Sequence, residues 1–155
     1  MRFLYCLLLA SLLSGCLVMP TPVPTNTTSA PYALSAEENL YAPKPEDDQL
    51  NRAEVILTSI NLSEQTNLNP VRVDINFLGS MPSVCNELRI QISPPEKDFR
   101  INIEVYSVTD PKINCENVFQ QFETNILLGV YSPGRYTVWV NNEFVGDFVS
   151  YQAID

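Results

Sequence analysis

The stretch that decides the fold is Arg135-Tyr136-Thr137-Val138-Trp139-Val140-Asn141-Asn142-Glu143-Phe144-Val145-Gly146-Asp147-Phe148. In its first half, Tyr136, Val138 and Val140 share one face, which is typical of a strand with one buried side and one solvated side. Asn141-Asn142 indicates a two-residue reversal, because asparagine tolerates positive φ better than most residues. We therefore predict a β-hairpin in which Glu143 to Phe148 forms the returning strand.

The same period of two recurs upstream of this hairpin. Alternating runs occupy Val71–Phe77, Leu88–Ile92 and Ile101–Val105, and Ala53–Leu62 is a further candidate strand. About seven short strands separated by proline- and glycine-containing breakers predict an all-β domain, a small immunoglobulin-like β-sandwich, over residues 51–155. Cys115, Val118, Phe119 and Phe122 also fit helical spacing, so one helical turn is an alternative at that point.

The amino-acid composition argues against several classes of function. The chain has 155 residues, with 18 acidic residues, 9 basic residues and no histidine, which gives a net charge of −9. A chain this acidic repels nucleic acid phosphates, so no nucleic acid partner is expected. The absence of histidine removes the commonest general base and the commonest metal ligand. We therefore expect a protein that is not an enzyme, with no catalytic residues, no metal and no soluble cofactor.

The N-terminus has the pattern of an export signal. Arg2 precedes an apolar run from Phe3 to Leu13, which is shorter than the roughly 20 residues that a membrane-spanning helix needs. Leu13-Ser14-Gly15-Cys16 resembles the lipobox of bacterial lipoproteins. The resemblance implies a signal peptide over residues 1–15, and diacylglycerol with an N-acyl chain such as palmitate on Cys16. The alternative is an ordinary secretory signal in which Cys16 is incidental.

Residues 16–50 are predicted to form the lipidated N-terminus and a disordered tether. Half of the prolines of the chain and several acidic residues lie in this segment, and few large apolar residues accompany them. Two acyl chains anchor a protein stably to a membrane, and Leu17 favours the outer membrane or cell surface in a bacterium with two membranes. Leu40-Tyr41 with its acidic flanks is an alternative docking peptide within this stalk.

The positions of the four cysteines predict a different role for each part of the set. Cys6 lies in the signal peptide and Cys16 carries the lipid, which leaves Cys85 and Cys115 in an oxidising compartment. Such a pair most simply forms one disulfide bond. The two cysteines are not part of a Cys-x-x-Cys motif, so we expect a structural role for this disulfide.

A few residues qualify as candidate sites. Trp139 lies on the face of its strand opposite Tyr136, where it either binds a partner or a sugar or is covered by the protein itself. Tyr136 is placed to form a tyrosine corner with the preceding loop. Oxygen ligands gather at Asp110, Asn114, Glu116 and Asn117, but their spacing matches no calcium loop, so solvated loop residues are the stronger interpretation.

The C-terminal part of the chain resembles the terminal module of a group of uncharacterised bacterial lipoproteins. The residues that carry the resemblance are Pro82, Cys85, Cys115, Phe122-Glu123, Ile126, Leu128 and the sequence Pro133-Gly134-Arg135-Tyr136-Thr137-Val138-Trp139-Val140-Asn141. The resemblance implies a β-sandwich with one disulfide and brings no activity with it.

The function expected from these patterns is a non-enzymatic binding or interaction module in the cell envelope, with an envelope protein or a glycan as partner. One alternative is a structural accessory subunit of an envelope assembly. Another is an inhibitor of a secreted enzyme that acts through a protruding loop at Met81-Pro82-Ser83.

The lipobox makes a direct prediction. Growth of the producing cells with an inhibitor of lipoprotein signal peptidase should make a larger precursor accumulate, because residues 1–15 stay attached when cleavage before Cys16 is blocked. Immunoblotting of treated and untreated cells checks this, with a Cys16→Ala variant as control. A single unchanged band in both cultures would contradict the lipoprotein assignment.

Overall fold

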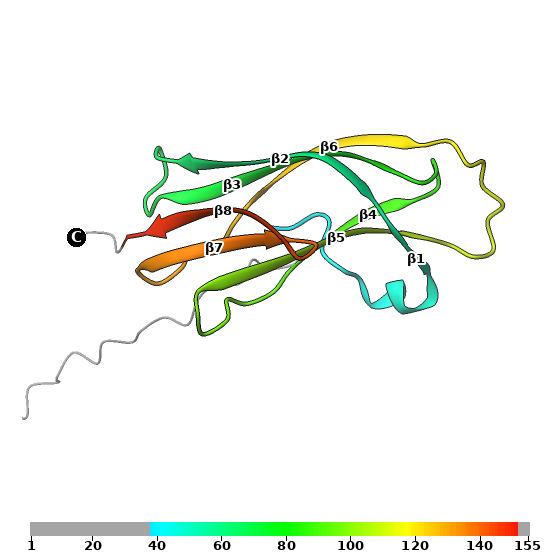
Figure 1. The fold of residues 1–155 in the computed structure, drawn as a ribbon. Coiled ribbons are helices and arrows are strands. Elements are labelled where there is room, and N and C mark those ends of the chain that lie inside the picture. Colours follow the sequence, from blue (N-terminus) through cyan, green and yellow to red (C-terminus); the bar gives the residue numbers. More distant parts are fainter. Residues whose placement is uncertain (1–37, 152–155) are drawn as a thin grey trace, which may run out of the picture.

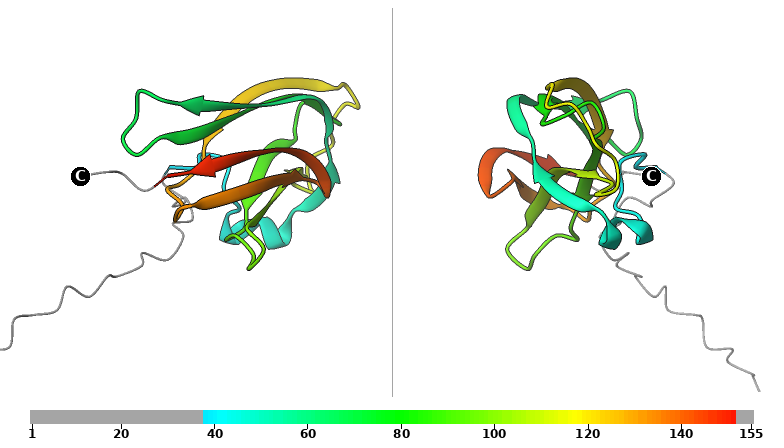
Figure 2. Two further views of the ribbon diagram at one scale, coloured as in Figure 1. Left: turned by 60° about the vertical axis from the view of Figure 1, so that its left-hand side comes forward. Right: turned by 90° about the vertical axis from the view of Figure 1, so that its right-hand side faces the viewer.

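The computed structural model describes residues 38–151, which form two facing β-sheets (Figure 1, Figure 2). The elements are η1 (Pro45–Gln49), β1 (Asn51–Glu54), β2 (Ile56–Gln65), β3 (Arg72–Met81), β4 (Glu87–Ile92), β5 (Arg100–Thr109), β6 (Gln120–Leu127), β7 (Gly134–Val140) and β8 (Glu143–Ser150). Strands β1, β4, β5, β7 and β8 make a five-stranded sheet, and β2, β3 and β6 make a three-stranded sheet. The predicted all-β sandwich is confirmed. Within residues 38–151, no helix has the length and apolar character to cross a membrane.

The core lies between the two sheets and follows the period-two pattern. Alternate residues of β3 and β7 are buried, while the intervening residues are partly or fully exposed. Strand β5 alternates in the same way up to Val105, after which Tyr106, Ser107 and Val108 are all buried. The largest fully buried side chains include Ile75, Phe77, Ile90, Ile101, Ile103, Leu128, Tyr136, Val138 and Val140. Burial of these apolar side chains supplies the main favourable free energy of folding.

Strand β5 is the centre of the larger sheet. Strand β4 pairs with one edge of β5, and β7 and β1 share the other edge. Strand β7 runs parallel to β5 over Arg100–Ile103, whereas β1 runs antiparallel to β5 over Tyr106–Thr109. The backbone between these two stretches of β5 therefore needs other hydrogen-bond partners.

Asn141 supplies those partners. The backbone N–H of Asn141 donates to the carbonyl oxygen of Ile103 (2.9 Å). Its side-chain Nδ2 donates to the carbonyl oxygen of Val105 (3.0 Å), and the N–H of Val105 donates to its Oδ1 (2.8 Å). The side-chain amide of Asn141 thus replaces a peptide group of the missing neighbour strand. The backbone φ is 48° at Asn141 and 69° at Asn142, which confirms the predicted two-residue reversal.

The candidate strand Ala53–Leu62 is two strands, not one. The chain leaves β1 at Glu54, passes Val55 and enters β2, which pairs with β3 in the other sheet. A single alternating run therefore serves both sheets, and this division accounts for an eighth strand. The helical turn considered near Cys115 does not form, and β6 begins directly at Gln120.

Residues 38–50, which we call the N-terminal arm, pack against the sandwich. The packed chain therefore extends further toward the N-terminus than the predicted boundary at residue 51. Tyr41 packs against the core, and its carbonyl oxygen accepts a hydrogen bond from Ile90 N–H (2.7 Å) on the edge of β4. Buried Asn39 donates to the carbonyl oxygen of Ile90 (2.8 Å).

An ion pair also fastens the arm to β4. Arg89, whose side chain is 4% exposed, pairs with Asp47 in η1 through its Nε (2.8 Å) and its Nη2 (2.9 Å). The packed part of the described chain therefore includes Asn39, and Tyr41 is not free to dock elsewhere.

Two further predictions are confirmed at the ends of the sandwich. Cys85 and Cys115 form a disulfide that joins the loop between β3 and β4 to the loop between β5 and β6. The hydroxyl of Tyr136 donates to the carbonyl oxygen of Ser132 (3.0 Å), as expected for a tyrosine corner. The predicted signal peptide, Cys16 and the first part of the predicted tether lie outside the described residues.

Candidate functional site

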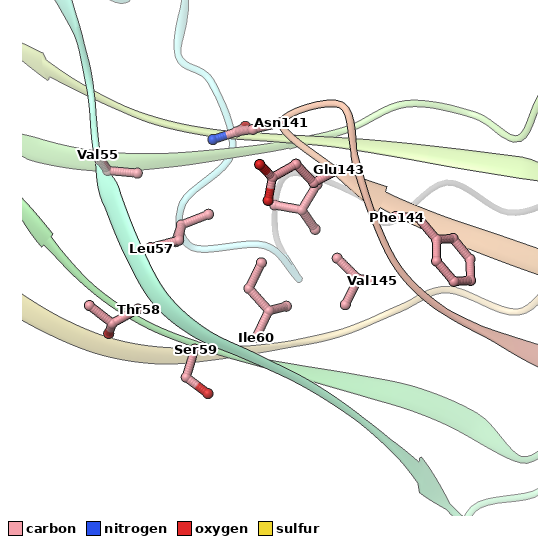
Figure 3. A pocket seen from close by; sticks show the side chains of 10 residues that line it. Val55, Leu57, Thr58, Ser59, Ile60, Asn141, Glu143, Phe144 and Val145 are labelled. Carbon is pink, nitrogen blue, oxygen red and sulfur yellow. The ribbon is translucent and has the colours of Figure 1, made fainter.

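An open pocket, which we call the edge groove, lies between β2 and the turn that joins β7 to β8 (Figure 3). Its volume is about 510 Å³. It is lined by Val55, Leu57, Thr58, Ser59, Ile60, Val140, Asn141, Glu143, Phe144 and Val145. Pockets of roughly 300–1,000 Å³ commonly hold ligands in proteins.

The groove exists because two sheet edges separate. Strand β2 is the last strand of the smaller sheet, and β8 is the last strand of the larger sheet. The two edges meet near Gly146, where a Cβ would lie 3.7 Å from Cδ2 of Leu62. Toward the turn at Asn141 an open space lies between them, because that turn is tied to β5 in its own sheet.

The groove has an apolar floor and a polar rim. Leu57, Ile60 and Val145 are partly buried against the core, and Figure 3 shows their side chains directed into the same space from β2 and β8. The rim carries hydroxyl, amide and carboxylate groups, and Glu143 is its one charged residue. Phe144 is 55% exposed beside this rim. An apolar floor ringed by a few polar groups is the usual build of a recognition site.

Each of the two groove walls contains a register irregularity. The pairing of β2 with β3 shifts between Leu57 and Ser59, and the pairing of β7 with β8 shifts between Val138 and Trp139. Bulges of this kind redirect side chains and are common beside functional sites. Here they coincide with the strand segments that line the edge groove.

A second pocket, of about 610 Å³, lies on the other side of Asn141. Its lining residues are Arg52, Ala53, Glu54, Val55, Glu104, Val105, Tyr106, Asn141 and Asn142. Arg52 pairs with Glu104 (2.9 Å) and lies 3.7 Å above the centre of the Tyr106 ring. Burial raises the pKa of Tyr106 above its ordinary value. Because Arg52 and Glu104 pair with each other, this pocket offers a partner less free charge than its composition suggests.

Trp139 is half-buried on the outer face of the larger sheet and is partly covered by the protein itself. The guanidinium of Arg100 lies 4.0 Å above its ring, and its Nε1 donates to Oγ1 of Thr137 (3.3 Å). Its ring also meets Phe144 edge to face, with 5.6 Å between the ring centres. Trp139 therefore contacts Phe144 on the outer face of the larger sheet. Phe144 lies at the margin of the groove lining, and Figure 3 shows its ring on the other side of β8 from Leu57, Ile60 and Val145.

The sequence pattern did not single out Phe144. The available signal was its position: two residues after the Asn-Asn reversal, it is the cross-strand partner of Trp139. A cross-strand aromatic pair on a solvated face is a reason to examine both residues.

The other candidate residues do not gather into a site. The loop Met81-Pro82-Ser83 does not protrude as expected, since Met81 and Ser83 are buried. Asp110 Oδ1 accepts the backbone N–H of Lys112 (2.8 Å) in a local turn. Across residues 38–151, no group of three or more cysteine or acidic side chains is placed to hold a metal ion.

Asp47, which accepts two hydrogen bonds from the buried Arg89, belongs to the arm rather than to a pocket. Its hydrogen bonds with Arg89 lower the pKa of the Asp47 carboxyl below the ordinary value of 3.8, and they raise the pKa of Arg89. Perturbed pKa values often mark catalytic groups. Here the cause is an ion pair that fastens the arm to β4, which is a structural role.

Comparison with known proteins supports the fold. Residues 75–150 match the family model of the ORF11 beta-sandwich domain, so the chain is similar to that family over this range. The match agrees with the C-terminal β-sandwich module that the sequence resemblance implies. No curated protein and no solved structure matches the chain.

The Asp47–Arg89 pair predicts a pH-dependent contribution to stability. Asp47→Asn should lower the free energy of unfolding by about 2 kcal/mol at neutral pH, because a hydrogen-bonded charge is lost. A lowered folded-state pKa stabilises the fold fully above the ordinary value of 3.8, and this contribution disappears as the pH falls through the folded-state value. Urea unfolding at neutral and acid pH should therefore show the difference between variant and parent shrinking in acid.

The neighbouring Asp48→Asn variant is the matched control, because Asp48 is an exposed residue of the same helical turn. Its substitution should change the free energy of unfolding by less than about 0.5 kcal/mol. Equal losses in the two variants would show that the ion pair with Arg89 does not hold the arm.

Proposed function

We propose that the protein is a lipid-anchored, extracytoplasmic lipoprotein of the bacterial envelope whose β-sandwich domain binds a partner without catalysing a reaction. The N-terminal pattern that ends in Leu13-Ser14-Gly15-Cys16 supports the anchor, with diacylglycerol and an N-acyl chain on Cys16. Leu17 supports the outer membrane or the cell surface as its location. The lack of histidine and the structural use of Asp47 support a non-catalytic role.

The observation that carries the binding role is the edge groove with Phe144 at its rim. Phe144 is a large aromatic side chain that is 55% exposed, and the contact of its apolar surface with water is unfavourable in free energy. Coverage by a partner would recover that free energy, and rigid aromatic anchors commonly dominate binding interfaces. The proposed partner is an envelope protein or a glycan.

A second candidate function is that of a structural subunit of an envelope assembly. It is favoured by exposed apolar side chains in the two loops that the Cys85–Cys115 disulfide joins. These side chains are Val84 (52% exposed), Ile113 (55%), Val118 (52%) and Phe119 (63%). A disulfide-braced apolar surface suits a permanent contact. The buried Met81-Pro82-Ser83 loop gives no such support to an inhibitor of a secreted enzyme.

Affinity capture from native envelope extract tests the two candidates against each other. Immobilised full-length parent, Phe144→Ala and Phe119→Ala are compared, and retained proteins and glycans are identified. We expect a partner that the parent and Phe119→Ala retain and that Phe144→Ala loses, because only Phe144 lines the edge groove. Truncation of an interface anchor typically weakens binding by about tenfold or more.

If only Phe119→Ala lost the partner, the edge groove would not be the binding site, and the role of a structural subunit would be favoured. Retention of nothing by the parent would contradict a binding role for the domain. Circular dichroism of the three proteins is the folding control, since both phenylalanines are exposed and their removal leaves the core intact.

A further inference from the structure

The edge groove is bounded by the unpaired edges of two β-strands. Strand β2 ends the three-stranded sheet and β8 ends the five-stranded sheet, and among residues 38–151 no strand pairs with the outer edge of either one. An edge strand presents a row of backbone donors and acceptors that an extended peptide can satisfy. The walls of this groove therefore offer main-chain hydrogen bonds, and its floor offers apolar contacts.

The edge of β2 lacks the features that usually prevent strand addition. Over Ile56–Gln65 the sequence contains no lysine and no proline, and Glu64 is its one charged residue. Proteins commonly protect exposed edges with lysine, proline or a covering segment. Strand β4 shows such protection, since the arm covers it through Tyr41 and Asn39 at Ile90. Strand β6 (Gln120–Leu127), the other edge of the smaller sheet, likewise contains no lysine and no proline. Strand β2 differs from β6 because it borders the edge groove.

The charge around the groove limits the kind of partner. Glu143 is the one charged residue of its lining, and Glu54 and Glu64 are exposed on either side along the same stretch of chain. The nearest arginine in the neighbouring pocket, Arg52, already pairs with Glu104. With a net charge of −9, the chain favours a cationic partner over an acidic one.

We infer that the edge groove binds an extended segment of a partner protein that adds as a strand to β2. In this segment, apolar side chains that enter the floor alternate with lysine or arginine side chains, one of which meets Glu143 at the rim. The inference rests on the proposed binding function and specifies the chemistry of its partner. Main-chain pairing supplies affinity, and the alternating side chains supply selectivity.

Peptide binding to the full-length protein tests this inference. The probe is a labelled peptide of about eight residues that alternates Lys and Val, which is an ordinary strand length. A peptide with Glu in place of Lys tests charge, and a Lys–Val peptide with alternate N-methylated amides tests main-chain pairing. Fluorescence anisotropy should show binding of the first peptide and at least fivefold weaker binding of the other two.

Variants of the protein locate the site of binding. Glu143→Lys should weaken binding of the Lys–Val peptide by roughly fivefold, because it replaces an attraction by a repulsion. Phe144→Ala should weaken binding by about fivefold or more through loss of apolar contact. Phe119→Ala is the matched control, because this exposed phenylalanine lies outside the groove lining, and it should leave binding unchanged.

Equal binding of all three peptides, or equal binding by the parent and both groove variants, would overturn the inference. A dimer of the protein that Glu143→Lys dissociates would also overturn it, because the occupant would then be a second copy. If no peptide binds while Phe144 still governs capture from envelope extract, strand addition is wrong and the binding module stands. If peptides bind as expected but no partner is captured, the proposed cellular function fails instead.

Discussion

The side-chain amide of Asn141 is the interaction on which the rest of the structure depends. It bonds both the N–H and the carbonyl of Val105, at the point where β7 ends and β1 has not yet begun along β5. Unpaired peptide groups at this partly buried edge would cost free energy, so the gap needs a hydrogen-bond partner that neither β7 nor β1 provides. Asparagine fills both requirements of this position, because it tolerates the positive φ of the turn and also carries an amide.

Two open pockets among the described residues follow from this attachment. Asn141 contributes to the lining of both the edge groove and the neighbouring pocket beside Arg52. Since the turn is held against β5, the adjacent edge of β8 separates from β2 instead of closing onto it. The same hydrogen bonds that complete one sheet therefore leave the space between the two sheet edges open to a partner.

Local patterns predicted much of this fold, and contacts between distant residues account for the rest. Alternation identified the buried faces, and the tolerance of asparagine for positive φ identified the Asn-Asn reversal. The place of Tyr136 after its loop identified the tyrosine corner, and the positions of the four cysteines identified the disulfide. Alternation does not say which sheet a residue joins, so the division of one run at Val55 had no local signal. The ion pair between Asp47 and Arg89 spans 42 residues, and a proline-rich, acidic segment reads locally as a tether. Phe144 was predictable from local sequence, because its position two residues after the Asn-Asn reversal makes it the cross-strand partner of Trp139.

The free energy of unfolding of Asn141→Gly, measured beside Asn142→Gly, tests the role of Asn141 most directly. Glycine keeps the positive φ at both positions, so the pair of variants separates the turn from the amide. The account predicts that Asn141→Gly loses about 1–3 kcal/mol, because the backbone groups of Val105 lose their partners. Asn142→Gly should be neutral or slightly stabilising, since Asn-Gly is a favoured turn sequence. Equal effects of the two substitutions would contradict the claim that the amide of Asn141 completes β5.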